Sequence, residues 1–507
     1  MRVTDPERPH TLTGRLGVGS IVFMVVAAAA PLTVIAGTVP LGLAYGNGAA
    51  FPTTFALCCG ILLLFAVGFC AMSRHVPEAG AFYSYVHKGL GRAPGLGAAF
   101  LALVTYAAVQ LAVFGYLGAV VDGLVRHWGG PALHLAPPWW VWSLAAIAVV
   151  GVLGYRHIEL SGRVLGALLV AEVAIVLVFD AVVVASGEHL STAFVRAPQI
   201  ASGSLGIAIM FAVASFIGFE ATAIFRDEAR DPQRTIPRAT YTALVLIGVF
   251  YTLSSWSVVS AWGDAAAIQA ATADPGNMIV NTMGTVLGPA GGDIAQVLLM
   301  TSLFAAALSF HNVLARYYFA LGNSGGMHGA LGRSHPKHCS PHVASLTQSV
   351  VAVTFVAIFA VAGMDPVTQV FAWMAGTATV GVLALMTLTC AAVLTYFYRT
   401  RVDVRAWQTR IAPGLGLIGL LACLTLTIGN FSTLIGGSGR LAAGIGAVLV
   451  LAFVLGAVWS RRPGSAGRPG TPGRADTNER PGARPAPAVA GPPSTVADPS
   501  PAAVEPV

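Results

Sequence analysis

One apolar run of the chain, residues 211–225, contains a glycine and a carboxylate near its middle, Gly218 and Glu220. If this run crosses a membrane, a charged side chain there costs roughly 2.5–3.5 kcal/mol, so it must face a protein interior or a water-filled cavity. A glycine at that depth lets a helix break where its backbone lines such a cavity. The pair therefore indicates a site for a small charged molecule. The alternative is a packing glycine beside a structural carboxylate.

Other apolar runs carry titratable side chains. Glu172 lies nine residues after Arg163, near the middle of its run, and Asp180 lies closer to the other end. A carboxyl group at the depth of Glu172 suits a reversible proton carrier, although it could also bond a hydroxyl on a neighbouring helix. His311 titrates near neutral pH and is a second candidate for proton coupling, or a histidine bonded within the interior.

The first apolar run contains its own interruption, Ala27-Ala28-Ala29-Ala30-Pro31-Leu32-Thr33. Pro31 lacks an N–H and disfavours the helical conformation at Ala30, yet proline suits the first position of a helix. The pattern predicts two half-helices, the second beginning at Pro31 with its free N–H groups pointing at the membrane centre. A simple proline kink is the alternative.

The composition is that of a protein with many membrane spans. Of the 507 residues, 56% are hydrophobic and only 10% are charged, against about 25% charged in soluble domains. The net charge of +7 does not indicate nucleic-acid binding, because the basic residues lie in loops rather than on one folded face. Six scattered cysteines indicate no disulfide framework.

Motifs for other chemistry are lacking in the sequence. The glycines at 14, 17 and 19 precede no strand and do not fit a phosphate-binding loop. Four histidines at 328, 335, 338 and 342, with Cys339, fit no regular zinc motif. No convergent nucleophile and base can be assembled from the apolar runs. We therefore expect no enzyme activity, no cofactor and no metal.

Twelve apolar segments are long enough to span a bilayer, which takes about 20 residues. They lie near 17–44, 52–72, 95–124, 139–156, 163–185, 203–225, 238–261, 292–320, 343–362, 367–397, 411–430 and 438–459. With the N-terminus inside, 25 of the 28 Lys and Arg residues fall on the cytoplasmic side, as positive charges in short loops do. This predicts a multi-pass protein of the cell membrane with both ends in the cytoplasm. The segment 461–507 is rich in proline and poor in large apolar residues, which predicts a disordered cytoplasmic tail.

Two motifs resemble one transporter family. Gly218-Phe219-Glu220, followed by Pro232-Gln233-Arg234-Thr235-Ile236-Pro237-Arg238-Ala239, resembles the sixth membrane helix and following loop of the amino acid–polyamine–organocation (APC) transporters. Residues 77–85 resemble the cytoplasmic segment that follows the family's second helix, with Ala81 in place of a glycine. The resemblance extends over roughly residues 12 to 400.

The resemblance implies an all-α integral membrane protein with 12 transmembrane helices. It implies the leucine-transporter-type 5+5 inverted repeat, in which helices 1 and 6 are broken. Residues 1–16 would form the cytoplasmic N-terminus, 17–185 the first repeat, 203–397 the second repeat and 411–459 the last two helices. Paired breaks of this kind mark a binding site near the membrane midplane.

The implied activity is secondary active transport of amino acids by alternating access, driven by protons or sodium. N–H groups around Thr33 would bind a carboxylate, and carbonyls of Ser215 and Phe216 an ammonium group. The candidate substrate-binding residues are Ala29, Ala30, Pro31, Leu32, Thr33, Tyr106, Gln110, Ser215, Phe216, Gly218, Phe219, Glu220 and Trp373. The candidate coupling residues are Glu172, Ser309 and His311.

The alanines before Pro31 replace the glycine-serine-glycine type of break that is common in the family. This departure leaves transport or exchange of polyamines and other organic amines as an alternative. A membrane sensor on the same fold that does not transport is a further alternative. The expected partners are a small amino acid or amine, a coupling ion and the lipid bilayer, with no nucleic acid.

Overall fold

The computed structural model describes residues 16–76, 81–129, 137–156, 162–187, 190–323, 325–335 and 340–461. Every regular element in these ranges is a helix. Most of the predicted cytoplasmic N-terminus, the first residues of the segment 77–85 and the predicted disordered tail lie outside the described residues.

The helices follow the apolar runs. The α-helices are α1 (Val18–Ala29), α2 (Pro31–Tyr45), α3 (Phe51–Ser73), α4 (Ala81–Leu90), α5 (Arg92–Gly129), α6 (Trp139–Tyr155), α7 (Gly162–Ser186), α8 (Ala197–Ile200), α9 (Leu205–Ala214), α10 (Pro232–Trp262), α11 (Asp264–Ala273), α12 (Met278–Leu287), α13 (Pro289–Asn323), α14 (His342–Val361), α15 (Ala372–Thr400), α16 (Ala412–Leu434) and α17 (Gly439–Trp459). Tighter or wider turns form η1 (Gly48–Ala50), η3 (Ala193–Val195), η4 (Phe219–Glu228), η5 (Gly329–Gly332), η6 (Pro366–Phe371) and η7 (Trp407–Ile411).

Ten helical segments in the described ranges are long and apolar enough to cross a membrane, and the bent pair of α1 and α2 makes an eleventh. The remaining predicted span corresponds to α6, which is apolar but has only 17 residues. At 1.5 Å per residue it reaches about 26 Å, less than the roughly 30 Å of the hydrocarbon core. The structure is therefore that of an all-helical membrane protein, and the count of twelve spans stays a prediction.

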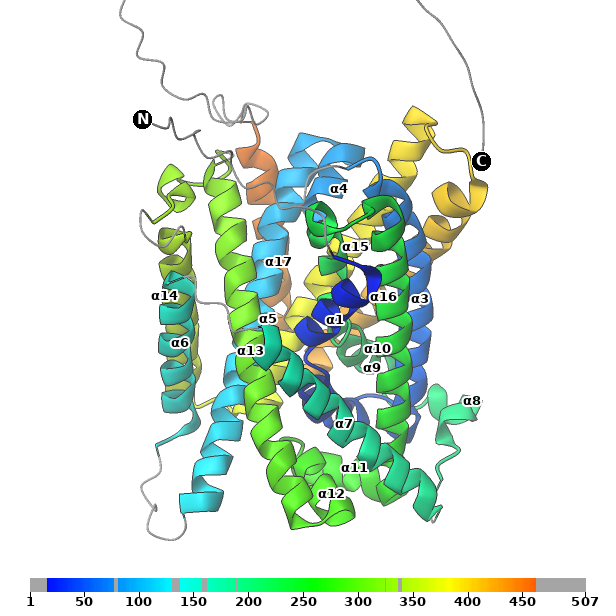
Figure 1. Cartoon of the computed structure of the whole chain (residues 1–507), viewed down its shortest axis with the longest axis vertical. Helices are drawn as coiled ribbons and strands as arrows, with labels where there is room; N and C mark the ends of the chain where they lie inside the picture. Colours follow the sequence, from blue (N-terminus) through cyan, green and yellow to red (C-terminus); the bar gives the residue numbers. More distant parts are fainter. Residues whose placement is uncertain are drawn as a thin grey trace, which may run out of the picture. The chain divides into compact units, whose positions relative to one another are not determined.

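Helix α5 is the longest, with 38 residues, and organises the packing. It contacts α4, α6, α13, α15 and α17 along its length (Figure 1). Helix α2 packs against α9, α11 and α13, which brings the first interruption beside the second. Between α10 and α13 the chain forms α11 and α12, two short helices that the hydropathy pattern does not predict.

Several helices keep large apolar side chains on their outer faces, notably α7, α14, α16 and α17. Such surface is unusual in a water-soluble protein and is expected of one that faces lipid. The five cysteines in the apolar runs are free and buried, as predicted.

Polar side chains mark where some helices begin. Ser204 Oγ accepts a hydrogen bond from the N–H of Ile207 (3.4 Å) at the start of α9. The Asp365 carboxylate accepts bonds from the N–H groups of Val367 (3.0 Å) and Thr368 (2.7 Å) at the start of η6. These contacts satisfy N–H groups that have no partner within the helix.

Candidate functional site

The first interruption is a true break between two helices. Ala30 adopts the left-handed conformation (φ 48°, ψ 70°), and α2 begins at the next residue, Pro31. The axes on either side differ by 47°. A proline kink would bend one continuous helix, whereas here the backbone of Ala30 adopts a conformation outside the right-handed helical range. The chain therefore presents the N-terminal end of a new half-helix, as the residues around Pro31 predict.

The second interruption follows α9, which ends at Ala214. Gly218 has φ 114°, a conformation that side chains rarely allow, and η4 begins at the next residue. The carbonyl of Phe216 accepts the N–H of Phe219 (3.3 Å). The carbonyl of Ser215 accepts no backbone N–H from the residues that the structure describes. This end of the broken helix thus offers the Ser215 carbonyl as an acceptor for a ligand.

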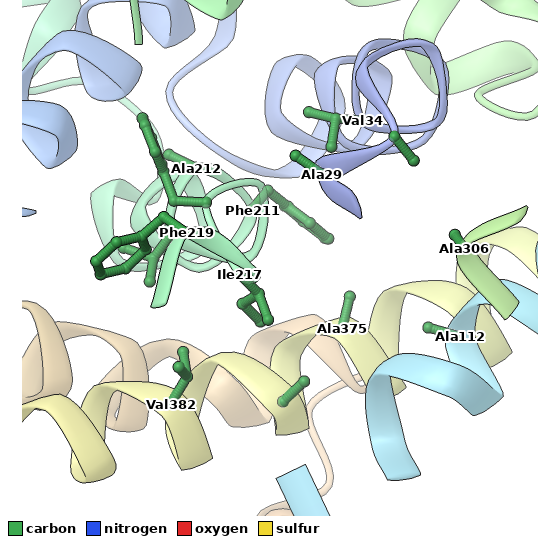
Figure 2. Close-up of a cluster of buried hydrophobic side chains, with 14 of the residues drawn as sticks. Ala29, Val34, Ala112, Phe211, Ala212, Ile217, Phe219, Ala306, Ala375 and Val382 are labelled. Carbon is green, nitrogen blue, oxygen red and sulfur yellow. The ribbon is translucent and has the colours of Figure 1, made fainter. Parts of the chain in front are cut away.

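A cavity of about 70 Å³ lies between the two interruptions. Its walls are mainly alanine and valine side chains, with hydroxyls from three positions; they are Ala29, Ala30, Thr33, Val34, Thr38, Val109, Ala112, Val113, Ala214, Ser215, Ile217, Ala306, Phe310, Phe371, Ala375 and Ala378. In Figure 2, Ala29, Ile217, Ala306 and Ala375 surround one space. Pockets for drug-sized ligands measure about 300–1,000 Å³, so this cavity suits only a small ligand unless the helices move apart.

Thr38 of α2 and Ser215, at the end of α9, both line this cavity and contact each other. Their hydroxyl oxygens lie 3.0 Å apart, and each hydroxyl also contacts the carbonyl four residues earlier in its own chain segment. This contact joins α2 to the end of α9.

Glu172 of α7 lies at the N-terminal end of α2. Ser302 Oγ of α13 donates to Glu172 Oε2 (2.9 Å), and Thr33 Oγ1 donates to Ser302 Oγ (3.0 Å). The backbone N–H of Leu32 also lies beside the Glu172 carboxylate. With only 4% of its surface exposed, Glu172 connects three helices at the edge of the break. A carboxylate is stabilised there by the positive end of the helix dipole.

Glu220 has both of its carboxylate oxygens engaged. Tyr106 OH donates to Oε1 (2.7 Å), and the N–H of Gly218 donates to Oε2 (2.9 Å). Glu220 is 3% exposed and does not line the cavity. These bonds attach α5 to the second interruption, which makes Glu220 a structural acceptor in this conformation.

Other candidate residues lie around the cavity rather than in its wall. The Phe216 ring packs on Tyr251, with centroids 6.1 Å apart, and the Phe219 ring packs on Phe65, at 6.0 Å. Figure 2 shows Phe219 pointing away from the space beside Ile217. Trp373 is half-buried and likewise does not line the cavity.

Two further candidates take part in hydrogen bonds between helices. Gln110 Nε2 donates to the carbonyl of Ala307 (3.2 Å), and Gln110 Oε1 accepts from Gln348 Nε2 (2.6 Å). His311 forms a 2.8 Å hydrogen bond between its Nε2 and Ser345 Oγ. These bonds join α5, α13 and α14.

The sequence reasoning missed Ser302, Thr38 and Gln348. It singled out Ser309 as the hydroxyl of the eighth span, but the hydroxyl that contacts Glu172 belongs to Ser302, two turns earlier. Both serines lie in one apolar run, and nothing in its pattern states which of them faces α7. Within the described ranges, no three His, Cys, Asp or Glu side chains gather as metal ligands.

Comparison with known proteins agrees with this architecture. The chain is 25% identical over 297 residues to the branched-chain amino acid permease BcaP of Bacillus subtilis (strain 168), which covers 56% of this chain and 62% of the relative. It is 22% identical over 299 residues to the low-affinity putrescine importer PlaP of Escherichia coli (strain K12), and this alignment covers 57% of this chain and 63% of the relative. It is 24% identical over 238 residues to the L-asparagine permease of Salmonella typhimurium (strain LT2), and this alignment covers 43% of this chain and 46% of the relative.

These alignments span less than two thirds of each relative. The family model described as amino acid permease matches a longer stretch, residues 20–463. This match includes both interruptions, the cavity between them and Glu172. The chain therefore belongs to the amino acid permease family, within the APC superfamily.

Proposed function

We propose that this protein is a secondary active transporter that carries small amino acids by alternating access and couples their movement to protons. The observation that carries the proposal is the position of Glu172, whose carboxylate accepts a hydrogen bond from Ser302 Oγ (2.9 Å) and lies beside the Leu32 N–H at the start of α2. That end of a half-helix is also where a substrate carboxylate would bind.

The two interruptions supply opposite ends of a binding site for an α-amino acid. In the first turn of α2, the Leu32 N–H lies beside Glu172 and the Val34 N–H donates to the carbonyl of Ala30 (3.1 Å), which leaves the Thr33 N–H for a substrate carboxylate. The open carbonyl of Ser215 would receive the ammonium group. The alanine-rich wall and the volume of about 70 Å³ favour a small aliphatic side chain.

Coupling follows from competition between two carboxylates. If Glu172 is ionised, a substrate carboxylate at the same helix end meets a like charge. Two charges about 5 Å apart at an effective dielectric constant of about 20 repel by about 3 kcal/mol, which weakens binding about 100-fold. A proton on Glu172 removes this repulsion, so substrate and proton bind together and cross together. Sodium is the alternative coupling ion.

A transporter or exchanger of polyamines or other organic amines is the second candidate, favoured by the likeness to a putrescine importer. A diamine has no carboxylate. Ionised Glu172 would then attract the ammonium group instead of repelling the substrate. The two candidates thus assign opposite effects to the same charge.

Several features of the architecture belong to the proposal. We propose twelve membrane spans with both ends of the chain in the cytoplasm. We also propose that residues 17–185 and 203–397 form two structural repeats that are inverted with respect to each other in the membrane. The support is the pair of interruptions, one in each half, together with the distribution of Lys and Arg over the loops. The cell membrane is the expected location.

The test compares wild-type protein with Glu172→Gln, which mimics the neutral carboxyl group. Binding of L-alanine, L-leucine, L-asparagine and putrescine is measured on the purified chain in nanodiscs at pH 5 and pH 8. For an amino acid carrier, the affinity of the wild-type protein for its amino acid is up to about 100-fold lower at pH 8 than at pH 5. The Glu172→Gln variant binds the amino acid equally well at both pH values. For an amine carrier, the variant loses putrescine binding at both values.

Asp122→Asn serves as a control, because Asp122 forms an exposed ion pair with Arg126 (2.9 Å). Uptake into proteoliposomes under an imposed pH gradient completes the test. A variant whose amino acid affinity keeps the wild-type pH dependence would refute the coupling role of Glu172. Binding without uptake in the wild-type protein would identify a sensor.

A further inference from the structure

A second buried carboxylate, Asp180, lies on α7 and takes no part in the cavity. It is 3% exposed. Ser254 Oγ of α10 donates to Asp180 Oδ2 (2.7 Å). Its other oxygen, Oδ1, is buried and has no hydrogen-bond partner among the described residues. A buried carboxylate with one open oxygen is costly to keep without a function or a further ligand.

Helix α10 carries a row of hydroxyl groups, of which Ser254 and Ser257 face Asp180. Tyr251, Ser254, Ser257 and Ser260 follow one another at intervals of three residues, so each lies next to the following one while the row winds about half way around the helix. Ser257 also approaches the Asp180 carboxylate. All four side chains are buried. In lipid, such a row is stable only where it packs against other protein.

The row continues to the end of α10. Ser260 Oγ accepts the N–H of Ser191 (3.2 Å), and Ser191 Oγ donates to Asp264 Oδ1 (2.6 Å). Asp264 is the half-buried first residue of α11, just beyond the last turn of α10. Polar side chains therefore lie between Asp180 and this end of the bundle.

In the other direction the row leads to Glu172. Tyr251 interacts electrostatically with Glu172, and the Tyr251 hydroxyl is buried without a hydrogen-bond partner in the part of the chain that the structure describes. Asp180 follows Glu172 by eight residues on α7, a rise of about 12 Å. Asp180 thus lies between Glu172 and the Asp264 end of the bundle.

Among the described residues, no basic side chain of α1, α2, α10, α12 or α13, the helices that pack most closely on α7, forms an ion pair with Asp180. Helices α1 and α12 contain no titratable residue, and α2 contains only Tyr45 at its last position. The arginines of α10, at 234 and 238, lie in its first turns. The titratable residues of α13 are Asp293 near one end, and His311, Arg316, Tyr317 and Tyr318 in its second half.

We propose that Asp180 is a second proton-binding site, which passes protons between the Asp264 end of the bundle and Glu172. The proposal rests on the proton coupling proposed for Glu172. A proton from water adds to the Asp180 carboxylate and forms its O–H bond. Transfer to Glu172 then breaks that bond and forms an O–H bond on the Glu172 carboxylate. No charge other than the proton moves.

The test is infrared difference spectroscopy of the full chain in lipid vesicles of known protein orientation. The carboxyl C=O band is recorded while the pH on one side changes between 8 and 5 and the other side is held constant. We expect a buried carboxyl band that responds to pH on the Asp264 side and is absent from Asp180→Asn. Ser254→Ala should keep this band but shift its frequency, because the 2.7 Å hydrogen bond is lost.

Asp293→Asn is the matched control, since Asp293 is an exposed carboxylate of α13 paired with His127 (3.3 Å). It should leave the buried band intact. If the wild-type protein and Asp180→Asn give the same difference spectrum, or if the Asp180 band responds only to pH on the opposite side, the relay is refuted. Because the readout does not require substrate, it stays separate from the uptake and binding tests of Glu172.

Discussion

The positive φ of Gly218 allows us to predict how a side chain at this position would change stability and binding. At φ 114° a residue with a side chain is strained, yet a Cβ placed on Gly218 would meet no atom within 4 Å. Gly218→Ala therefore adds backbone strain without a clash. It also keeps the N–H that donates to Glu220 Oε2 at 2.9 Å. The substitution isolates the cost of the conformation itself.

Strain of this kind amounts to about 1–3 kcal/mol. We expect Gly218→Ala to lower the free energy of unfolding by that amount, or to shift the break and weaken substrate binding about 5–150-fold. Equilibrium unfolding in sodium dodecyl sulfate, followed by tryptophan fluorescence, measures the first effect. Binding in nanodiscs measures the second.

Gly429 of α16 provides the control. A Cβ on Gly429 also meets no atom within 4 Å, but its backbone has no positive φ. Alanine is preferred over glycine inside a helix by roughly 0.5–1 kcal/mol, so Gly429→Ala should be neutral or slightly stabilising. If both substitutions change stability and binding by equal amounts, the conformation of Gly218 does not hold the second interruption in place.

Two further perturbations act on named bonds. Tyr106→Phe removes the 2.7 Å hydrogen bond to buried Glu220 and should lower the free energy of unfolding by about 1.5–3 kcal/mol. The same detergent titration measures this change. An unchanged free energy of unfolding would mean that the Glu220 carboxylate does not need the hydrogen bond from Tyr106. In the loop after α15, the hydrogen bond from Arg405 lowers the pKa of the Asp403 carboxyl from 3.8 to about 2. A carboxyl group whose pKa is lower in the folded state than in the unfolded state stabilises the folded protein at pH values above its unfolded-state pKa. The Tm of the wild-type protein should therefore exceed that of Asp403→Asn by its full amount at about pH 5, and this difference should shrink as the pH falls toward 2. An advantage that does not vary with pH would refute this.

Composition and local chemistry were enough to predict the class of protein and the first interruption. A chain with 10% charged residues cannot be an ordinary soluble domain. Proline at position 31 interrupts helical hydrogen bonding whatever surrounds it, and the left-handed Ala30 lies directly before it. The motif around Gly218 and Glu220 likewise predicted the family that the comparisons show.

The identity of the side chains that line the cavity was decided only by the tertiary structure. Lipid and protein interior are both apolar, so a membrane helix has little amphipathic pattern to reveal its inward face. The rotation of α13 selects Ser302 rather than Ser309 for Glu172, and the turn after α9 directs Phe216 toward α10. These choices depend on how neighbouring helices pack, because contacts far apart in the chain set the rotation of each helix.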